Sequence, residues 1–311
     1  MARHPQNTSD PAYEDRIILF IDFLAFKEIV DETESDREAL RRLLHAMDAL
    51  AEIGRDTSIQ SQRVSQFSDS IVVSYRIDEV SGVFWLLMEM AWAVIDLANR
   101  GYLLRGAVTF GPLFHSEHHV VGPAMVKAYL MESKQAKYPR VIIDPALLKI
   151  ARRNRAEQHS PAEEAAYVKH FMRRDDDGLF FFDYVSWKAV VEHAGADDDA
   201  YGPYLARLSA QIERGLNHKD PGVVEKYLWL YRHYRASIDS FAKLPAGHPY
   251  RRQSPENCAV IEALPKFAQR VRAGKAKVAA ATAKRAAAAA AVAAMDQPAK
   301  AGAPKRSRRA V

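Results

Sequence analysis

The sequence predicts an α+β fold, a ferredoxin-like sheet with helices mainly on one side, followed by a helical C-terminal extension. Over residues 14–186, short apolar β-rich runs alternate with segments of helical period. Two of these runs, at 64–67 and 71–75, are joined by a short polar tip and predict a hairpin. From 187 to 272 the apolar spacing is helical, with an expected core of Leu205, Leu208, Ile212, Tyr227, Leu230 and Tyr234.

The first half of the chain contains a strand, a helix and the hairpin. Residues 1–13 are polar, include two prolines and are expected to be mobile. The continuous apolar run inside 16–23 is typical of a buried central strand. A helical period covers 24–54 and ends at Gly54, with one face formed by Leu40, Leu43, Leu44, Met47 and Leu50.

The elements that follow are predicted at 81–99 (helix), 103–111 (strand), 124–135 (helix), 139–144 (strand) and 179–184 (strand). The apolar helix carries Glu89 and Asp96 and is too short to span a bilayer, so we expect it to be buried and expect no membrane partner. Residues 273–311 are rich in alanine, lysine and arginine and are expected to form a disordered tail.

The net charge of +5 comes from the tail. From Gly274 onward nine basic residues stand against Asp296, which gives +8 and leaves −3 for the rest of the chain. We therefore do not expect a nucleic-acid partner. The single cysteine, Cys258, excludes an intramolecular disulfide, and the N-terminus lacks the apolar core of a signal peptide. A cytoplasmic protein is expected.

Two aspartates stand where predicted strands end. Asp22 follows the apolar run of the first strand, and Asp69 lies at the hairpin tip. If these strands are neighbours, both carboxylates lie at one edge of the sheet. They would repel unless a divalent cation lay between them, and hard oxygen ligands suit Mg²⁺ or Mn²⁺. The alternative is a pair of surface turn carboxylates, since aspartate is common in turns.

Together, residues 16–185 resemble the catalytic domain of the class III nucleotidyl cyclases. The resemblance rests on four segments in the order of that family: Asp22-Phe23-Leu24-Ala25-Phe26, the tip with Asp69, the strand Leu104 to Pro112, and the helix from Gly122 to Met131-Glu132-Ser133. Arg173-Arg174 stands where the family has a late basic turn before an aromatic strand.

Several positions depart from the purine cyclases of that family. Val126 and Leu130 replace the asparagine and arginine of the helix, His119 replaces the base-reading aspartate, and Ser65 replaces the lysine. The chain is more similar to the pyrimidine cyclases of the Pycsar anti-phage systems. The segments that carry this similarity are Phe67-Ser68-Asp69-Ser70, Arg105-Gly106-Ala107, Ala128-Tyr129-Leu130-Met131-Glu132 and Pro139-Arg140-Val141.

The resemblance implies a homodimeric enzyme that makes cyclic UMP from UTP, with cyclic CMP from CTP as the alternative, and a separate effector protein that responds to the product. It implies two Mn²⁺ or Mg²⁺ ions per site, held by Asp22, Asp69 and the Phe23 carbonyl. Further expected nucleotide contacts are the phosphate-binding segment Leu24, Ala25, Phe26 and Lys27, the cations Arg105, Lys127, Arg173 and Arg174, and Ser65 and His119.

Other interpretations stay open at this point. A purine cyclase with an unusual site would act on ATP or GTP, and a non-catalytic interaction module would need neither aspartate. Arg105 could be only a strand-end ion pair. The loop with His115, His118 and His119 and the acidic run 175–177 are expected to be solvated turns.

Overall fold

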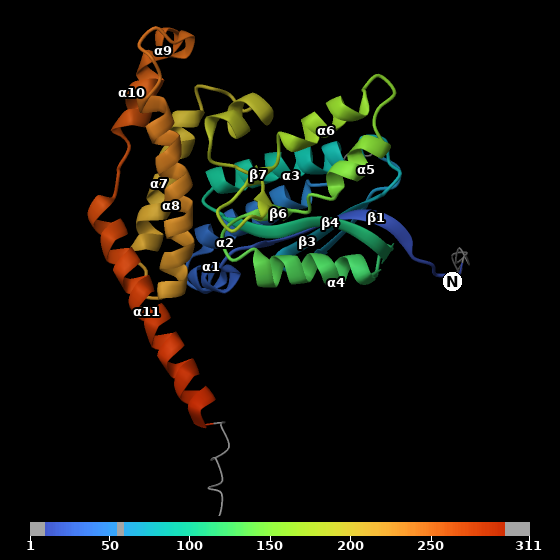
Figure 1. Ribbon diagram of the computed structural model, residues 1–311, viewed down its shortest axis with the longest axis horizontal. Helices are drawn as coiled ribbons and strands as arrows, with labels where there is room; N and C mark the ends of the chain where they lie inside the picture. Colours follow the sequence, from blue (N-terminus) through green and yellow to red (C-terminus); the bar gives the residue numbers. More distant parts are fainter. Residues whose placement is uncertain (1–9, 55–58, 296–311) are drawn as a thin grey trace, which may run out of the picture.

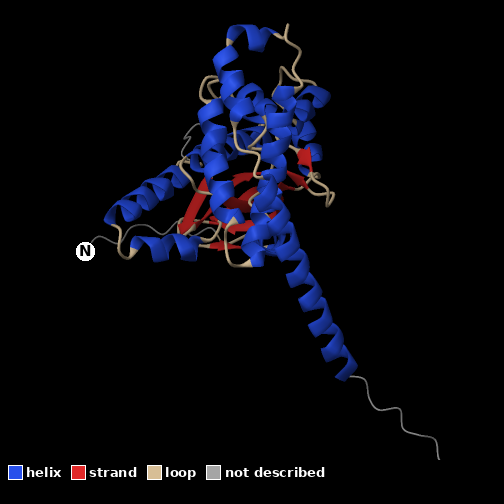
Figure 2. Ribbon diagram, turned by 90° about the vertical axis from the view of Figure 1, so that its left-hand side faces the viewer, coloured by secondary structure: helices blue, strands red, loops and turns tan. Residues whose placement is uncertain are grey.

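The computed structural model describes residues 10–54 and 59–295. An eight-stranded sheet lies between helices, and a bundle of further helices stands at one end of it (Figures 1 and 2). The strand order is β2-β3-β1-β4-β6-β8-β7, and the short strand β5 pairs with β4.

The first half of the chain builds the ferredoxin-like unit that the sequence predicts. Its β-α-β-β-α-β elements have the antiparallel spatial order β2-β3-β1-β4. The elements are β1 (Glu14–Phe23), α1 (Phe26–Thr33), α2 (Arg37–Ala51), β2 (Arg63–Phe67), β3 (Ser70–Arg76), α3 (Gly82–Asn99) and β4 (Leu104–His115). The predicted helix over 24–54 is two helices, because Asp36 caps a new one through a bond from the Glu38 amide.

The second half adds strands to the free side of β4. Strand β6 runs parallel to β4, and β8 and β7 complete that edge in antiparallel pairs. The elements are β5 (Val120–Val121), α4 (Pro123–Leu130), the π-helical turn η1 (Met131–Gln135), β6 (Val141–Ile143), α5 (Leu147–Arg153), α6 (Pro161–Lys169), β7 (Arg173–Arg174) and β8 (Phe180–Phe181). Helix α6, which the sequence analysis missed, starts with a capping box between Ser160 and Glu163.

Alternate residues of β1 face two different cores. Ile17, Leu19 and Ile21 belong to the large core that also contains buried residues of α2, α3, α5 and α6. Ile18 and Phe20 point the other way and pack with Ala124 and Ala128 of α4. Figure 1 shows the same layers, with α3, α5 and α6 on one side of the sheet and α4 on the other. The helices therefore lie mainly on one side, as predicted.

Helix α3 is a core helix of this sheet. It is the one described helix that is long and apolar enough to cross a membrane. Nine of its residues are buried inside the protein, among them Leu86, Leu87 and Met90. The predicted burial of this segment is confirmed. In contrast, Leu40 and Leu44 of α2 are exposed, so only part of the face predicted there is core.

The helical extension is present as expected. It consists of the π-helical turn η2 (Lys188–His193), α7 (Tyr201–Leu216), α8 (Pro221–Ala242), α9 (Pro249–Gln253), α10 (Pro255–Ala263) and α11 (Ala268–Met295). Five of the six predicted core residues are buried, and Tyr227 is half-buried. These helices stack beside the end of the sheet (Figures 1 and 2).

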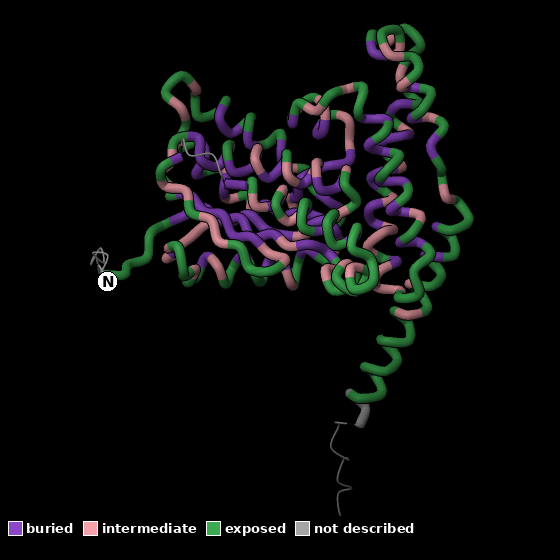
Figure 3. Tube along the Cα trace, turned by 180° about the vertical axis from the view of Figure 1, so that it is seen from behind, coloured by how far each residue is buried: buried purple, intermediate pink, exposed green. Residues whose placement is uncertain are grey.

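Helix α11 corrects the expectation of disorder from residue 273 to residue 295. Val271 is buried and Val278 packs on the core, while a Cβ at Gly274 would lie 3.0 Å from Val224 of α8. This small apolar stripe provides the partner face that the sequence analysis did not find, and alanine continues the helix by its high propensity. Beyond it the helix is exposed (Figure 3). The predicted tail at 296–311 lies outside the described residues.

Candidate active site

The two predicted metal-binding aspartates lie on neighbouring strand ends. The ladder between β1 and β3 pairs Asp22 with Ser70, the residue after Asp69. In addition, the Phe23 amide donates to the Asp69 carbonyl at 3.2 Å. The hairpin tip is thereby fixed against the end of β1, so the structure brings Asp22 and Asp69 to the same edge of the sheet.

A third carboxylate, Glu132, joins this edge. Arg105 follows the first residue of β4 and is paired with Asp22 in the ladder; its Nη2 lies 3.3 Å from Asp22 Oδ2. The same Nη2 forms an ion pair with Glu132 Oε1, and the Glu132 side chain is only 3% exposed. Glu132 lies in the π-helical turn η1, where an extra residue in the turn changes which side chains face the sheet. Sequence reasoning named Glu132 only as part of a motif.

The Arg105 guanidinium contacts two of the carboxylates at this edge, Asp22 and Glu132, and the pKa values of both are raised. Burial is the main cause that raises the pKa of Asp22 to about 7; Arg105 opposes this, and Glu132 and Asp69 add to it. Burial also raises the pKa of Glu132, again against Arg105. Asp22 Oδ1 is buried and has no hydrogen-bond donor among the described residues. At this edge the carboxylates therefore outnumber the one arginine, and Asp22 offers an oxygen atom that has no hydrogen-bond donor among the described residues. Both features suit a divalent cation.

The phosphate-binding segment is partly as predicted. The Leu24 amide donates to the Leu103 carbonyl at 2.8 Å, so it is not available to a phosphate, which corrects that part of the prediction. Ala25 precedes α1 with φ 63°, the left-handed conformation that glycine adopts most readily. Phe26 and Lys27 begin α1, and the Lys27 side chain is exposed. Phosphate binding by the amides at the start of α1 stays a prediction.

Ser65 belongs to a buried polar network. Its hydroxyl lies 3.0 Å from His115 Nε2, while His115 Nδ1 lies 2.8 Å from Ser74 Oγ. Arg16 Nε donates to that same Ser74 oxygen at 2.8 Å. Burial and the nearby Arg16 lower the pKa of His115 to about 4, so the imidazole is neutral at pH 7. His115 is therefore a core residue and not part of a solvated turn.

His119 lies beside the tip of the hairpin. Its amide donates to Ser116 Oγ at 3.1 Å in a tight loop. The residue lines an open cavity of about 780 Å³ together with Phe67 and Tyr13. Phe67 is two residues from both Ser65 and Asp69 on the hairpin. His119 therefore lies near the hairpin that carries Ser65 and Asp69.

Three basic side chains that were predicted to contact the nucleotide form other contacts in the structure. Lys127 Nζ lies 2.7 Å from Asp144 Oδ2, and Arg173 Nη1 lies 2.6 Å from Asp183 Oδ2. Arg174 bonds its own loop at the Gly178 carbonyl. Strand β7, which carries both arginines, is four strands from β1, or roughly 19 Å along the sheet. Within one chain the two arginines therefore lie far from Asp22, and their contact with the terminal phosphates stays a prediction.

The prediction of a solvated turn at 175–177 holds for Asp176, whose side chain is 83% exposed, but not for Asp175. Asp175 is buried and accepts from Arg140, from Arg232 and from Trp229 Nε1. The fully buried Arg140 also pairs with Asp177, and its carbonyl accepts from the Gly106 amide at 3.2 Å. Because Arg232 and Trp229 belong to α8, this network ties the helical extension to the strand that carries Arg105.

The extension also places a positive charge near the site. Lys226 of α8 is half-buried; burial is the main cause that lowers its pKa, followed by the charge of Arg105, while Glu28, Asp220 and Asp22 oppose. A lysine of α8 therefore lies within electrostatic range of the carboxylate edge. The helical pattern of residues 187–272 does not indicate that Lys226 lies near the carboxylates.

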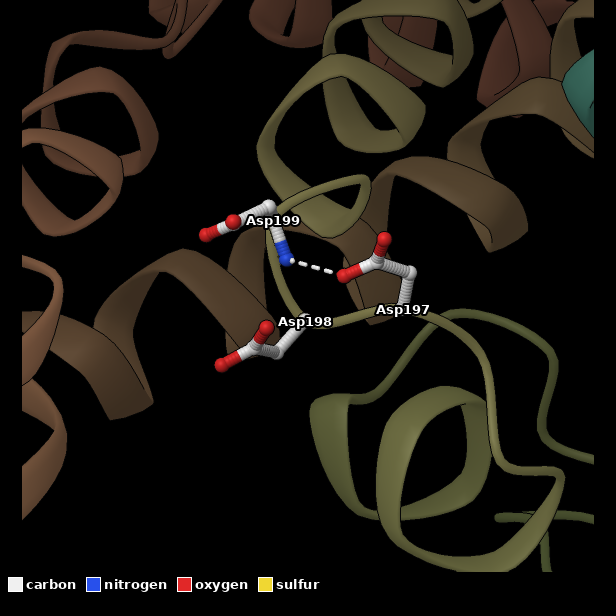
Figure 4. Close-up of side chains that lie close together, drawn as sticks. All are labelled: Asp197, Asp198 and Asp199. Carbon is white, nitrogen blue, oxygen red and sulfur yellow. Dashed lines mark hydrogen bonds between the residues drawn. The ribbon is translucent and has the colours of Figure 1, made fainter.

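A further acidic group, Asp197 to Asp199, lies in the loop before α7 (Figure 4). One carboxylate oxygen from each comes within 4.8 Å of the others. The Asp199 amide donates to Asp197 Oδ1 at 3.0 Å, and Asn257 donates to Asp199 at 2.7 Å. Aspartate side chains commonly form such hydrogen bonds in turns, so the bonds explain why these three carboxylates lie close together.

Comparisons with known proteins give structural similarities only. No protein-family model matches the chain, and no curated protein matches it. Among solved structures, the chain is similar to the adenylyl cyclase CyaB from P. aeruginosa, with 13% identity, a TM-score of 0.36 and coverage of 45% of this chain and 82% of that chain. Two structures of a bacterial light-regulated adenylyl cyclase are also similar. One has 16% identity, a TM-score of 0.35 and coverage of 46% of each chain. The other has 13% identity, a TM-score of 0.35 and coverage of 58% of this chain and 93% of that chain.

Proposed function

We propose that this chain is a metal-dependent nucleotidyl cyclase that converts UTP to 3′,5′-cyclic UMP and pyrophosphate. The observation that carries the proposal is the group of Asp22, Asp69 and Glu132 at one sheet edge beside a single arginine, with a buried Asp22 oxygen that has no donor among the described residues. Such an edge binds divalent cations, and paired cations are the usual means of handling a triphosphate.

Asp22 and Asp69, with the Phe23 carbonyl, would hold two Mn²⁺ or Mg²⁺ ions. When bound, such ions stabilise negative charge on the phosphates and lower the pKa of the attacking 3′-hydroxyl. Glu132 would keep Arg105 at the edge, since the two form an ion pair. A cation would also offset the burial that now raises the pKa of Asp22 to about 7.

The residues around the carboxylates would orient the substrate. The free amides at the start of α1, with the charge of Lys27, would bind the β and γ phosphates. Arg105 would stabilise the α-phosphate as the 3′-oxygen bonds to phosphorus and the bond to the bridging oxygen breaks; its buried Nε has no partner among the described residues. Ser65 and His119 would face the base, since His119 lines the cavity beside Phe67.

We propose a homodimer because part of the site lies too far away within one chain. Arg173 and Arg174, which would bind the terminal phosphates, and Lys127 would act from a second copy. An exposed apolar stripe on α4 supports this arrangement: Val126 is 58%, Tyr129 52% and Leu130 45% exposed, at the spacing of one helix face. A second copy would cover this stripe by an isologous contact.

The choice of UTP rests on the resemblance to the Pycsar pyrimidine cyclases, and CTP is the alternative substrate. The same resemblance supports a role in anti-phage defence, in which a separate effector protein in the cytoplasm responds to the cyclic nucleotide. The departures at Ser65, His119, Val126 and Leu130 support a pyrimidine over a purine.

The test is the variant Asp69→Ala with Asp78→Ala as the matched control. Asp78 is an exposed aspartate just beyond the other end of β3, paired with Arg76. We expect Asp69→Ala to abolish cyclic nucleotide formation and to weaken Mn²⁺ binding in calorimetry, with an unchanged circular dichroism spectrum. Asp78→Ala should leave both unchanged. Full activity of a folded Asp69→Ala protein would exclude the proposed site.

A further inference from the structure

Helix α11 has no part in the proposed cyclase chemistry. It has 28 residues, runs beside α8 and continues past the end of the helical bundle (Figure 1). Every charged residue in it is basic, and these residues are Arg270, Arg272, Lys275, Lys277, Lys284 and Arg285. Because the segment is helical, its charges have fixed positions relative to one another, which a disordered tail would not give them.

The contacts of α11 with the bundle define one side of the helix. Val271 is buried, Val278 packs on the core, and Gly274 lies close to Val224 of α8. Each residue turns an α-helix by about 100°, so Ala276, Ala283 and Ala287 lie on the opposite side, and all three are exposed. The alanine side of α11, defined by these three residues, therefore faces away from the bundle.

Basic residues stand on both flanks of the alanine side. By the same turn of about 100° per residue, Arg272 and Lys275 lie on one flank, and Lys277 and Lys284 lie on the other. All four are exposed. Two rows of positive charge thus run along the helix, with small side chains between them.

These four cations have no acidic partner within the part of the chain that the structure describes. Arg270, nearer the start of the helix, differs, because its Nη2 lies 2.9 Å from Glu213 Oε1. Lys277 Nζ donates to the His218 carbonyl at 2.9 Å, which leaves two of its three N–H groups for another acceptor. The two flanks therefore carry positive charge that an anionic partner can neutralise.

We propose that α11 binds double-stranded DNA, with its alanine side toward the floor of the major groove and its basic flanks on the phosphates of the two walls. That groove is about 12 Å wide and admits an α-helix. The alanines let the helix backbone lie close to the base edges, and the contacts to phosphate are independent of sequence. The expectation of no nucleic-acid partner rested on the charge of the chain before Gly274, whereas α11 carries charge of the opposite sign.

Two other anionic partners fit this helix less well. Duplex RNA has a deep, narrow major groove that does not admit an α-helix. A helix that lies on a membrane surface usually buries tryptophan, phenylalanine or leucine, and the alanine side has none of these.

The test is fluorescence anisotropy of a labelled DNA duplex of mixed sequence, titrated with the full chain. We expect a Kd of about 1–100 µM at about 0.15 M salt, the range of sequence-independent DNA binding. The double variant Lys275→Gln and Lys284→Gln, which loses one cation from each flank, should bind about thirtyfold more weakly. The slope of log K against log salt should fall in magnitude by about 2. The matched control is Arg152→Gln with Arg153→Gln, two exposed arginines at the end of α5, which should change Kd less than about twofold.

A comparison of two neighbouring residues tests the orientation of the helix. Arg285 lies on the side of α11 that the bundle contacts nearer the start of the helix, away from the alanine side. Lys284→Gln should therefore weaken binding about fivefold, the loss of one phosphate contact at about 0.15 M salt, and Arg285→Gln less than about twofold. Equal effects of the two would mean that the charge acts without the proposed orientation and would overturn the groove contact.

The choice of DNA is tested with two other probes under the same conditions. Duplex RNA of the same sequence should bind at least about fivefold more weakly, because contacts within the groove are lost. Vesicles containing phosphatidylserine should compete with DNA only weakly. No binding of DNA at about 0.15 M salt, equal binding of duplex RNA, tighter binding to the vesicles, or an equal loss in the α5 control would each overturn the proposal.

Discussion

Replacing Asp22 by asparagine is expected to stabilise the metal-free protein at alkaline pH while abolishing its activity. The folded pKa of Asp22 is about 7, above the ordinary 3.8, because the group is buried near Glu132 and Asp69. The folded state therefore holds this proton more tightly than the unfolded state, and the unfolding free energy falls as pH rises from about 4 to about 7. The whole difference is on the order of 4 kcal/mol.

The assay is urea unfolding in EDTA between pH 5 and pH 8. We expect Asp22→Asn to exceed the wild type by about 1–4 kcal/mol at pH 8 and by much less near pH 5. The control is Asp144→Asn: burial raises the pKa of Asp144, but bonds from Lys127, the Ala146 amide and Thr109 outweigh it and lower the pKa. This control should lose stability at pH 8. A less stable Asp22→Asn, or a difference that does not vary with pH, would refute the reasoning.

Three other changes have defined outcomes. Ala25→Gly should stabilise the chain by about 1 kcal/mol in urea unfolding, since Ala25 has φ 63°; a loss would contradict the left-handed assignment. Arg140→Leu should cost about 1–3 kcal/mol, because Asp175 loses one of its two arginine partners and keeps Arg232; no measurable cost would exclude a structural role for Arg140. Truncation after residue 282 should leave turnover and the melting temperature unchanged, because residues 283–292 of α11 are exposed; lost turnover would give the tail a function in catalysis.

Local patterns in the sequence were sufficient to predict the centre of the fold. The apolar run before Asp22 and the short polar tip with Asp69 each depend on neighbouring residues only, so the strand and the hairpin follow from them. That the two lie side by side, with Asp22 and Asp69 at one edge, is a long-range pairing that the structure supplies. The α4 segment, with glycine before a proline at its start, is likewise a local signal.

What the sequence could not predict depends on partners far along the chain. Glu132 reaches Arg105 because the helix turns into a π-helical segment, which no periodicity indicates. The acidic run 175–177 looks solvated until Arg140 and α8 are placed beside it. Helix α11 needs Val224 of α8 as its partner face, and an alanine-rich segment does not show that partner.

The central claim, that the carboxylate edge cyclises a pyrimidine nucleotide, is tested most directly by identifying the product. Purified protein would be incubated with Mn²⁺ and separately with ATP, GTP, CTP and UTP, and the products resolved by mass spectrometry. We predict cyclic UMP from UTP, lost in both Asp22→Ala and Asp69→Ala. A cyclic monophosphate from ATP or GTP alone, or a product that survives both substitutions, would contradict the claim.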